Sequence, residues 1–335
     1  MSHLNKPHFQ NEEAAFAKLE SIVWPNGPVC PHCGAVDRIF ALNGVRTKAN
    51  KTHPEGLVRY GLKKCGHCRK QFTARMGTVF ESSHIPLHKW LQASHLLCSS
   101  KKGISSHQLH RVLQISYKAA WFASHRLREA MRTGSLTPPQ MGGAGRVVEI
   151  DETIFGRAST HPKGRRRKDS RITNSAHRNV ILSLVERSGE VRSYHIEGST
   201  VSQVIPIVIN NVSREAQVMT DSAMLYKGMN RDGWFASHDR VDHSEKEYAR
   251  YELGRVVIHT NTVEGYFSVF KRGMRGTYQH CGEKHLHRYL AEFDFRYNNR
   301  IGLGVDDSQR AAAALQGVKG KRLTYRTTGS SRSAT

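Results

Sequence analysis

The sequence predicts a chain of the α/β class, in which an α/β core follows a small cysteine-rich domain and a helical region. Three observations support this prediction. Two Cys-x-x-Cys pairs lie within the first 70 residues, and capped helical segments follow between residues 86 and 128. From residue 146 onward, short runs rich in Val and Ile alternate with stretches of helical spacing, the pattern of an α/β domain.

Length and charge set the first limits on function. At 335 residues the chain is long enough for two or three domains with cores of their own. Its formal net charge of +23 attracts polyanions, so nucleic acid is the expected partner, although a generally basic protein would share this composition. The sequence has no apolar run of about eighteen residues and no signal-peptide core at its N-terminus, so we expect a cytoplasmic protein without a membrane partner.

The first segment, residues 1–80, combines a helix with a cysteine-rich domain. Apolar positions at helical spacing follow an Asn cap over residues 11–24. Two knuckles of two cysteines each, tightened by Pro or Gly, predict a structural Zn²⁺ site in a zinc ribbon, with strands at 38–42 and 57–62 between them. A redox-active cysteine pair is the less favoured alternative. The predicted zinc ligands are Cys30, Cys33, Cys65 and Cys68.

Residues 81–133 predict a helical region that binds DNA. One helix starts at Pro86, and two more, Ser105–Leu113 and Ser116–Arg128, each begin with a Ser cap and meet at a tight joint. A short helix, a brief turn and a longer basic helix form the helix-turn-helix pattern, in which the second helix enters the major groove. The alternative is a helical hairpin packed on the core. The residues expected to face DNA are Ser116, Tyr117, Lys118 and Arg126.

A Gly- and Pro-rich linker, 134–145, separates this region from the core at 146–302. A strand, a hairpin, a helix and a further strand follow in that order, which fits a ribonuclease-H-like fold. Residues 303–335 form a C-terminal extension that we expect to be disordered at its end. The predicted strands are 147–153, 179–186, 190–196, 216–220 and 255–259, and the predicted helices include 201–212 and 283–299.

Three acidic side chains in the core suggest a metal site. Asp151 and Asp221 each end an apolar strand, and Glu264 lies at the start of a helix, with Lys271 two turns beyond it on nearly the same side. Hard oxygen ligands of this kind suit two Mg²⁺ or Mn²⁺ ions that act on a phosphodiester. Taken alone, Glu264 is better interpreted as a surface residue of an amphipathic helix, and the two upstream aspartates change that interpretation.

Two polar stretches near these acids have weaker signals. A basic run between the first strand and the hairpin could grip phosphate or simply form a solvated loop. Asp242 and Glu245 are rival carboxylates, but they lie in a polar stretch and do not end an apolar strand, and the neighbouring His243 could orient a phosphate or a water. The residues of the basic run assigned to DNA binding are Arg165, Arg166 and Arg167.

The acidic motifs occur in the order Ile150-Asp151-Glu152, Thr220-Asp221-Ser222 and Asn261-Thr262-Val263-Glu264, followed by Lys271-Arg272. This order resembles the DDE core of bacterial insertion-sequence transposases of the ISXO-like, zinc-ribbon type. The resemblance extends from the first cysteine to about residue 300. Further matching motifs are Gly276-Thr277-Tyr278, Tyr289-Leu290, Glu292-Phe293 and Arg296-Tyr297-Asn298-Asn299-Arg300.

The resemblance implies a nucleoid-associated transposase that binds the ends of its element and catalyses metal-dependent strand cleavage and transfer into target DNA. It implies at least a dimer on DNA. Asp151, Asp221 and Glu264 would hold two Mg²⁺ or Mn²⁺ ions, with Asn261 as the alternative third residue. Lys271 and Arg272 would contact DNA near the cut. The rival interpretations are a zinc-ribbon DNA-binding regulator with an inactive core, and a ribonuclease-H-like nuclease without strand transfer.

Overall fold

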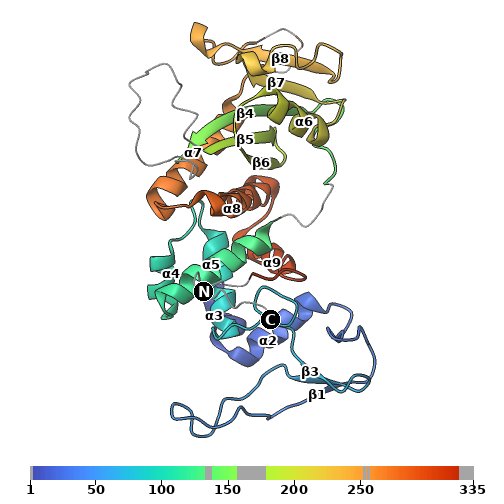
Figure 1. Cartoon of the computed structure of the whole chain (residues 1–335), viewed down its shortest axis with the longest axis vertical. Coiled ribbons are helices and arrows are strands. Elements are labelled where there is room, and N and C mark those ends of the chain that lie inside the picture. Colours follow the sequence, from blue (N-terminus) through green and yellow to red (C-terminus); the bar gives the residue numbers. More distant parts are fainter. Residues whose placement is uncertain (1–2, 133–137, 157–178, 252–253, 255–256, 324–335) are drawn as a thin grey trace, which may run out of the picture. The chain divides into compact units, whose positions relative to one another are not determined.

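The computed structural model describes residues 3–132, 138–156, 179–251, 254 and 257–323, and the chain divides into two units (Figure 1). The first unit comprises Met1–Ser100, Ile104–Arg132 and Asp307–Thr335, and the second comprises Lys101–Gly103 and Thr133–Asp306. None of the helices in the described part of the chain combines the length and apolar composition that a bilayer crossing needs.

The first unit opens with helices α1 (Pro7–Gln10) and α2 (Glu12–Val23). The helix predicted at 11–24 is confirmed, and its cap is Asn11, whose side chain accepts the N–H of Ala14 at 3.1 Å. A three-stranded antiparallel sheet follows, and its strands are β1 (Ile39–Ala41), β2 (Lys63–Cys65) and β3 (Gln71–Phe72).

The strand predicted at 57–62 is wrong. Within it, Val58 forms only an isolated bridge to Arg46, and the partner of β1 is β2, which begins at Lys63. The second cysteine knuckle explains the shift. Cys65 is fully buried and pairs with Ile39, so the strand pairing forms directly beside the knuckle.

The helical part of the first unit contains α3 (Leu87–Ser99), α4 (Ser106–Leu113), α5 (Tyr117–Met131) and α9 (Asp307–Gln316). Both predicted Ser caps are confirmed, because Ser105 accepts the N–H of Gln108 at 3.1 Å and Ser116 accepts that of Ala119 at 3.2 Å. Gln114, in the joint between the two helices, adopts a left-handed φ of 50°.

Helix α9 was not predicted, and its residues had been assigned to a C-terminal extension. It packs on α3 and buries Ala311, Ala314 and Leu315. Arg310 is also buried and donates to the backbone carbonyl of Cys98 at 3.0 Å. The segment after Asp307 is therefore a structural part of the first unit. The expected disorder from about residue 320 concerns mostly residues outside the described part.

The second unit contains a five-stranded mixed sheet in the order β6-β5-β4-β7-β8 (Figure 1). Strand β4 is antiparallel to β5, β5 is antiparallel to β6, and β7 and β8 continue the sheet in parallel with β4. The strands are β4 (Val147–Phe155), β5 (Asn179–Glu186), β6 (Val191–Ile196), β7 (Gln217–Asp221) and β8 (Ser237–Val241).

Strand β8 was not predicted, whereas the strand predicted at 255–259 is not found among its described residues. There Ile258 forms only an isolated bridge to Arg250. Strand β8 escaped prediction because it lies at the edge of the sheet, where only Val241 is fully buried. Its sequence, Ser-His-Asp-Arg-Val, therefore lacks the apolar run expected of a buried strand.

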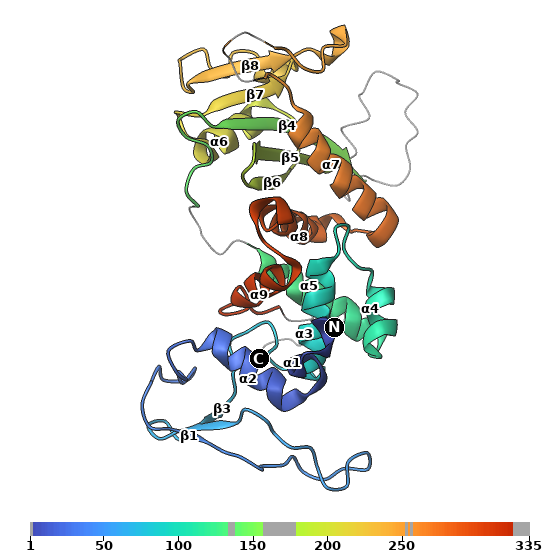
Figure 2. The ribbon, with the colours of Figure 1, turned by 180° about the vertical axis from the view of Figure 1, so that it is seen from behind.

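Helices cover both faces of the sheet. The side chains of β5 point alternately to the two faces of the sheet. Leu182 and Leu184 pack on the face covered by α6 (Val201–Asn211), and Ile181 and Val185 pack on the opposite face. Helices α7 (Asn261–Gly273) and α8 (Leu286–Asn298) complete the second face (Figure 2). The short helical turns of the chain are His3–Asn5, Met224–Tyr226, His243–Glu245, Met274–Tyr278, Glu283–His285 and Ile301–Leu303.

The end of the predicted linker packs in the core of the second unit. Met141 is 1% exposed and forms a parallel bridge to Val212. Gly142 has a φ of +79°, and a Cβ at this position would lie 2.7 Å from the side chain of Ala216. The core of the second unit therefore begins a few residues earlier than residue 146.

Candidate functional site

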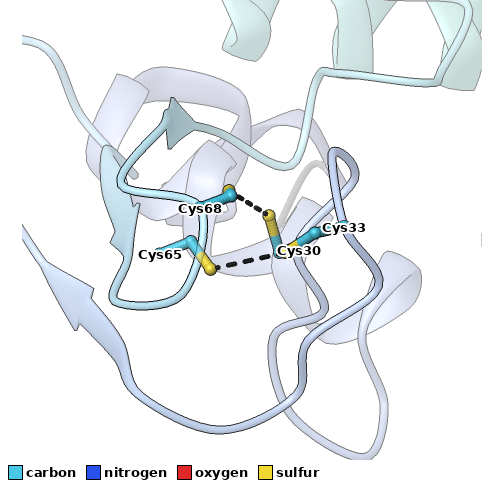
Figure 3. Close-up of side chains that lie close together, drawn as sticks. All are labelled: Cys30, Cys33, Cys65 and Cys68. Atoms are coloured by element: carbon cyan, nitrogen blue, oxygen red, sulfur yellow. Dashed lines mark hydrogen bonds between the residues drawn. The ribbon is translucent and has the colours of Figure 1, made fainter.

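Four cysteine side chains converge in the first unit (Figure 3). The Sγ atoms of Cys30, Cys33, Cys65 and Cys68 all lie within 4.8 Å of one another, with 3.7 Å between Cys30 and Cys68 and 3.6 Å between Cys33 and Cys65. Zn–S bonds of about 2.3 Å at tetrahedral angles place sulfurs roughly 3.8 Å apart. The four thiolates therefore fit a structural Zn²⁺ ion.

Asp151 and Asp221 are brought together by the pairing of β4 with β7. The two strands run parallel, with Val147 opposite Gln217 and Glu149 opposite Met219. Asp151 and Asp221 lie two residues beyond the last of these pairs, and the negative charge of Asp221 contributes to the raised pKa of Asp151. Asp221 ends β7, whereas Asp151 lies in the middle of β4, which continues to Phe155.

The electrostatics of Asp151 link these two acids to two more. Burial is the largest cause, and together with the negative charges of Glu152, Asp221 and Glu264 it raises the pKa of Asp151 to about 8. We call these four residues the carboxylate cluster. A bound divalent cation would neutralise these mutually repelling charges. Asp151 and Glu152 are largely buried and Glu264 is exposed, and in the described residues the four acids do not form a group within metal-ligand distances. The donor set of hard oxygens suits Mg²⁺ or Mn²⁺.

Glu152 belongs to the carboxylate cluster, although the sequence analysis gave it no role. Burial raises its pKa, and the fully buried Tyr226 donates its hydroxyl to Oε2 of Glu152. Its position directly after Asp151 was the signal, but an adjacent acid in a strand is expected on the opposite face. Only the tertiary contact with Tyr226 reveals its environment.

Glu264 lies in the first turn of α7, where its carboxylate acts on Asp151 and contacts His243. Asn261, the alternative third residue, is exposed one turn earlier. In the last turn, Lys271 is half-buried and Arg272 is exposed. The opposite face of α7 is buried, through Val263, Tyr266, Phe267 and Phe270.

The rival carboxylate Asp242 has a local structural role. Its Oδ1 accepts hydrogen bonds from the backbone N–H of Ser244 at 2.9 Å and from the Ser244 hydroxyl at 2.6 Å. These bonds also lower the pKa of Asp242. Asp242 therefore closes the turn that presents His243.

The four residues predicted to face DNA divide into two groups. Ser116, Tyr117 and Lys118 form the exposed start of α5, and the ring of Tyr117 stacks on His107 with centroids 4.2 Å apart. Arg126 was assigned wrongly, because it is only 5% exposed.

The guanidinium of Arg126 has structural partners inside the first unit. It donates to the backbone carbonyls of Val79 and Glu81 at 2.8 Å each, and to that of Leu323 at 3.1 Å. The guanidinium also lies over the ring of Phe122, 4.5 Å from its centroid. The predicted DNA-binding residues Arg165, Arg166 and Arg167 lie outside the described residues.

Comparisons with known proteins identify the domains in which the two sites lie. Residues 142–298 match the family model of the ISXO2-like transposase domain, and residues 10–71 match that of the transposase zinc-ribbon domain. The chain is also 26% identical over 302 residues to an uncharacterized protein in the transposable element ISH50 of Halobacterium salinarum. That similarity covers 86% of this chain and 91% of the Halobacterium protein.

Proposed function

Because the chain belongs to the ISXO2-like, zinc-ribbon family of insertion-sequence transposases, we propose that it binds the ends of its element and catalyses metal-dependent strand cleavage and transfer into target DNA. The single observation that supports the chemistry most strongly is the carboxylate cluster. Asp151 and Asp221 follow the paired part of β4 and β7, and the negative charges of Asp221 and Glu264 both act on Asp151.

In this proposal Asp151, Asp221 and Glu264 hold two Mg²⁺ or Mn²⁺ ions, and Asn261 is the alternative to Glu264. When bound, the cations would activate the attacking hydroxyl and stabilise the leaving 3′ oxygen. Water is the first nucleophile, and the freed 3′-hydroxyl of the element then attacks the target phosphodiester in line. The positive charges of Lys271 and Arg272, in the last turn of α7, would contact the DNA backbone near the cut.

The topology supports a ribonuclease-H-like core. Three antiparallel strands, β6, β5 and β4, are followed by two parallel strands, with helices on both faces. Helices α4 and α5, joined at the left-handed Gln114, support a helix-turn-helix role. Since most of α5 is buried, its contact with bases would be limited to the first turn, at Ser116, Tyr117 and Lys118. Joining two element ends would require at least two chains.

A strand-transfer assay tests this function. The zinc-loaded protein is incubated with labelled DNA bearing an end of its element and with a supercoiled target, in Mg²⁺ or in Ca²⁺. Ca²⁺ replaces the usual chelator control, because a chelator would also remove zinc. We expect joined product in the reaction with Mg²⁺ and none in the reaction with Ca²⁺. Nicking without joining would indicate a nuclease, and end binding without nicking in Mg²⁺ or Mn²⁺ would indicate a DNA-binding regulator.

A further inference from the structure

Glu149 is a fully buried acid on β4 that contacts the start of α7. Its side chain is 0% exposed. Its Oε2 atom accepts the backbone N–H groups of Thr262 at 2.8 Å and of Val263 at 3.0 Å, and Oε1 accepts the Thr262 hydroxyl at 2.8 Å. One carboxylate of the sheet thus makes three hydrogen bonds to the first turn of a helix that lies 112 or more residues later in the chain.

These bonds supply a cap that the helix lacks locally. Thr260, at the N-cap position of α7, makes no side-chain capping bond. The first N–H groups of a helix have no partner within the helix, and a negative charge near them also interacts favourably with the helix dipole. Glu149 therefore provides the cap from a different element, and it fixes where α7 begins relative to β4.

The charge of Glu149 is balanced by Arg187, the residue that follows β5. The Nε atom of Arg187 lies 2.6 Å from Oε1 of Glu149. The same guanidinium donates to the carbonyls of Val257 at 2.7 Å and His259 at 2.9 Å, in the segment that leads into α7. A buried carboxylate with this many donors is fully satisfied, so its geometry is well defined.

The position of Glu149 links two members of the carboxylate cluster. It precedes Asp151 by two residues on β4, so both side chains point to the same face of the sheet. Val263, whose N–H it accepts, directly precedes Glu264. The contact between β4 and α7 through Glu149 is thus immediately adjacent to Asp151 on one side and to Glu264 on the other.

We propose that Glu149 is a positioning residue, which holds Glu264 at the separation from Asp151 that a shared divalent cation requires. It does so through α7, without contacting metal or DNA itself. This inference rests on the proposed function, because it assumes that the carboxylate cluster binds metal. Side chains that orient metal ligands in this indirect way typically change metal affinity by about 10–100-fold when replaced.

The test measures Mn²⁺ binding to the zinc-loaded full chain by the loss of the free-ion electron paramagnetic resonance signal. Asp151→Asn defines which binding belongs to the carboxylate cluster. We expect Glu149→Gln to weaken that binding on the order of tenfold, and Thr262→Val, which removes a single hydrogen bond, to weaken it by about threefold. In cleavage assays the half-saturating Mg²⁺ concentration should rise while DNA affinity stays unchanged.

Glu292→Gln is the matched control, because Glu292 is also fully buried and forms an ion pair with Arg296 within α8. It should lower thermal stability without changing Mn²⁺ affinity. A folded Glu149→Gln variant with wild-type Mn²⁺ affinity overturns the inference alone. If Glu149→Gln does not fold, unchanged affinity in Thr262→Val overturns it. Wild-type protein that binds Mn²⁺ no better than Asp151→Asn overturns the metal site itself, and the inference with it.

Discussion

Nε2 of His243 lies 3.2 Å from Oε1 of Glu264 and 3.2 Å from the hydroxyl of Thr260, so one imidazole touches both the proposed metal ligand and the residue before α7. Replacing His243 with Ala removes a contact to a charged group, and we expect end cleavage to slow by about tenfold with unchanged DNA affinity. Single-turnover cleavage measures this. His280→Ala, at an exposed histidine of the same unit, should behave as wild type. Wild-type cleavage by His243→Ala would remove His243 from the site.

The raised pKa of Asp151 predicts a pH-dependent cost to stability in the absence of divalent metal. The unfolded chain releases this proton near the ordinary value of 3.8, whereas the folded protein keeps it until about pH 8. Between these values the unfolded state binds fewer protons, so the contribution of Asp151 destabilises the fold increasingly as pH rises from about 4 to about 8.

Asp151→Asn should therefore raise the Tm of the magnesium-free protein at pH 8, and the gain should shrink toward pH 5. Added Mg²⁺ should stabilise the wild type more than the variant, since bound metal relieves the same repulsion. Thermal unfolding of both proteins at each pH, with and without Mg²⁺, measures these differences. An equal Tm for both proteins at pH 8 would contradict the assigned electrostatics.

The four-cysteine site predicts one zinc ion per chain. Cys33→Ser and Cys65→Ser should lose it, because a structural zinc site needs all four ligands, and the ribbon should then fail to fold. Zinc content by colorimetric release and DNA binding by mobility shift measure the effect. Cys281→Ser, at a cysteine in the other unit, should retain one equivalent. Full zinc content in Cys33→Ser would refute the ligand assignment.

Arg126 and Lys118 lie on the same helix and should respond differently to Ala substitution. Arg126→Ala leaves the carbonyls of Val79 and Glu81 without this donor in a buried place, which should cost roughly 2–3 kcal/mol of stability. Lys118→Ala should leave the Tm unchanged, weaken end binding and reduce the salt slope of binding by about one. Equal DNA affinity for Lys118→Ala and wild type would argue against α5 as a DNA contact.

Features with a local cause could be predicted from the sequence. The Ser105 and Ser116 caps, the cysteine knuckles and the end of β7 at Asp221 each follow from a few neighbouring residues, and the structure contains them where expected. The strand that carries Asp151 continues to Phe155, so the prediction that Asp151 ends a strand is wrong.

Features that depend on distant partners could not be predicted. Arg126 has an ordinary surface sequence context, and only the carbonyls of residues 79, 81 and 323 explain its burial. The role of Glu149 depends on Thr262, more than 100 residues away. Strand β8 lies at the edge of the sheet and pairs only with β7. Its sequence therefore contains too few apolar residues to be recognised as a strand.

The most direct test of the central claim is metal-dependent nicking of end DNA by single-residue variants of the carboxylate cluster. Labelled end DNA is incubated in Mg²⁺ with wild type, Asp151→Asn, Asp221→Asn, Glu264→Gln and Asn261→Ala, after equal DNA binding has been verified. We predict that the three acidic variants bind but do not nick, and that Asn261→Ala nicks. Loss of nicking in Asn261→Ala but not in Glu264→Gln would move the third ligand to Asn261. Nicking by Asp151→Asn at the wild-type rate would contradict the assignment of this site.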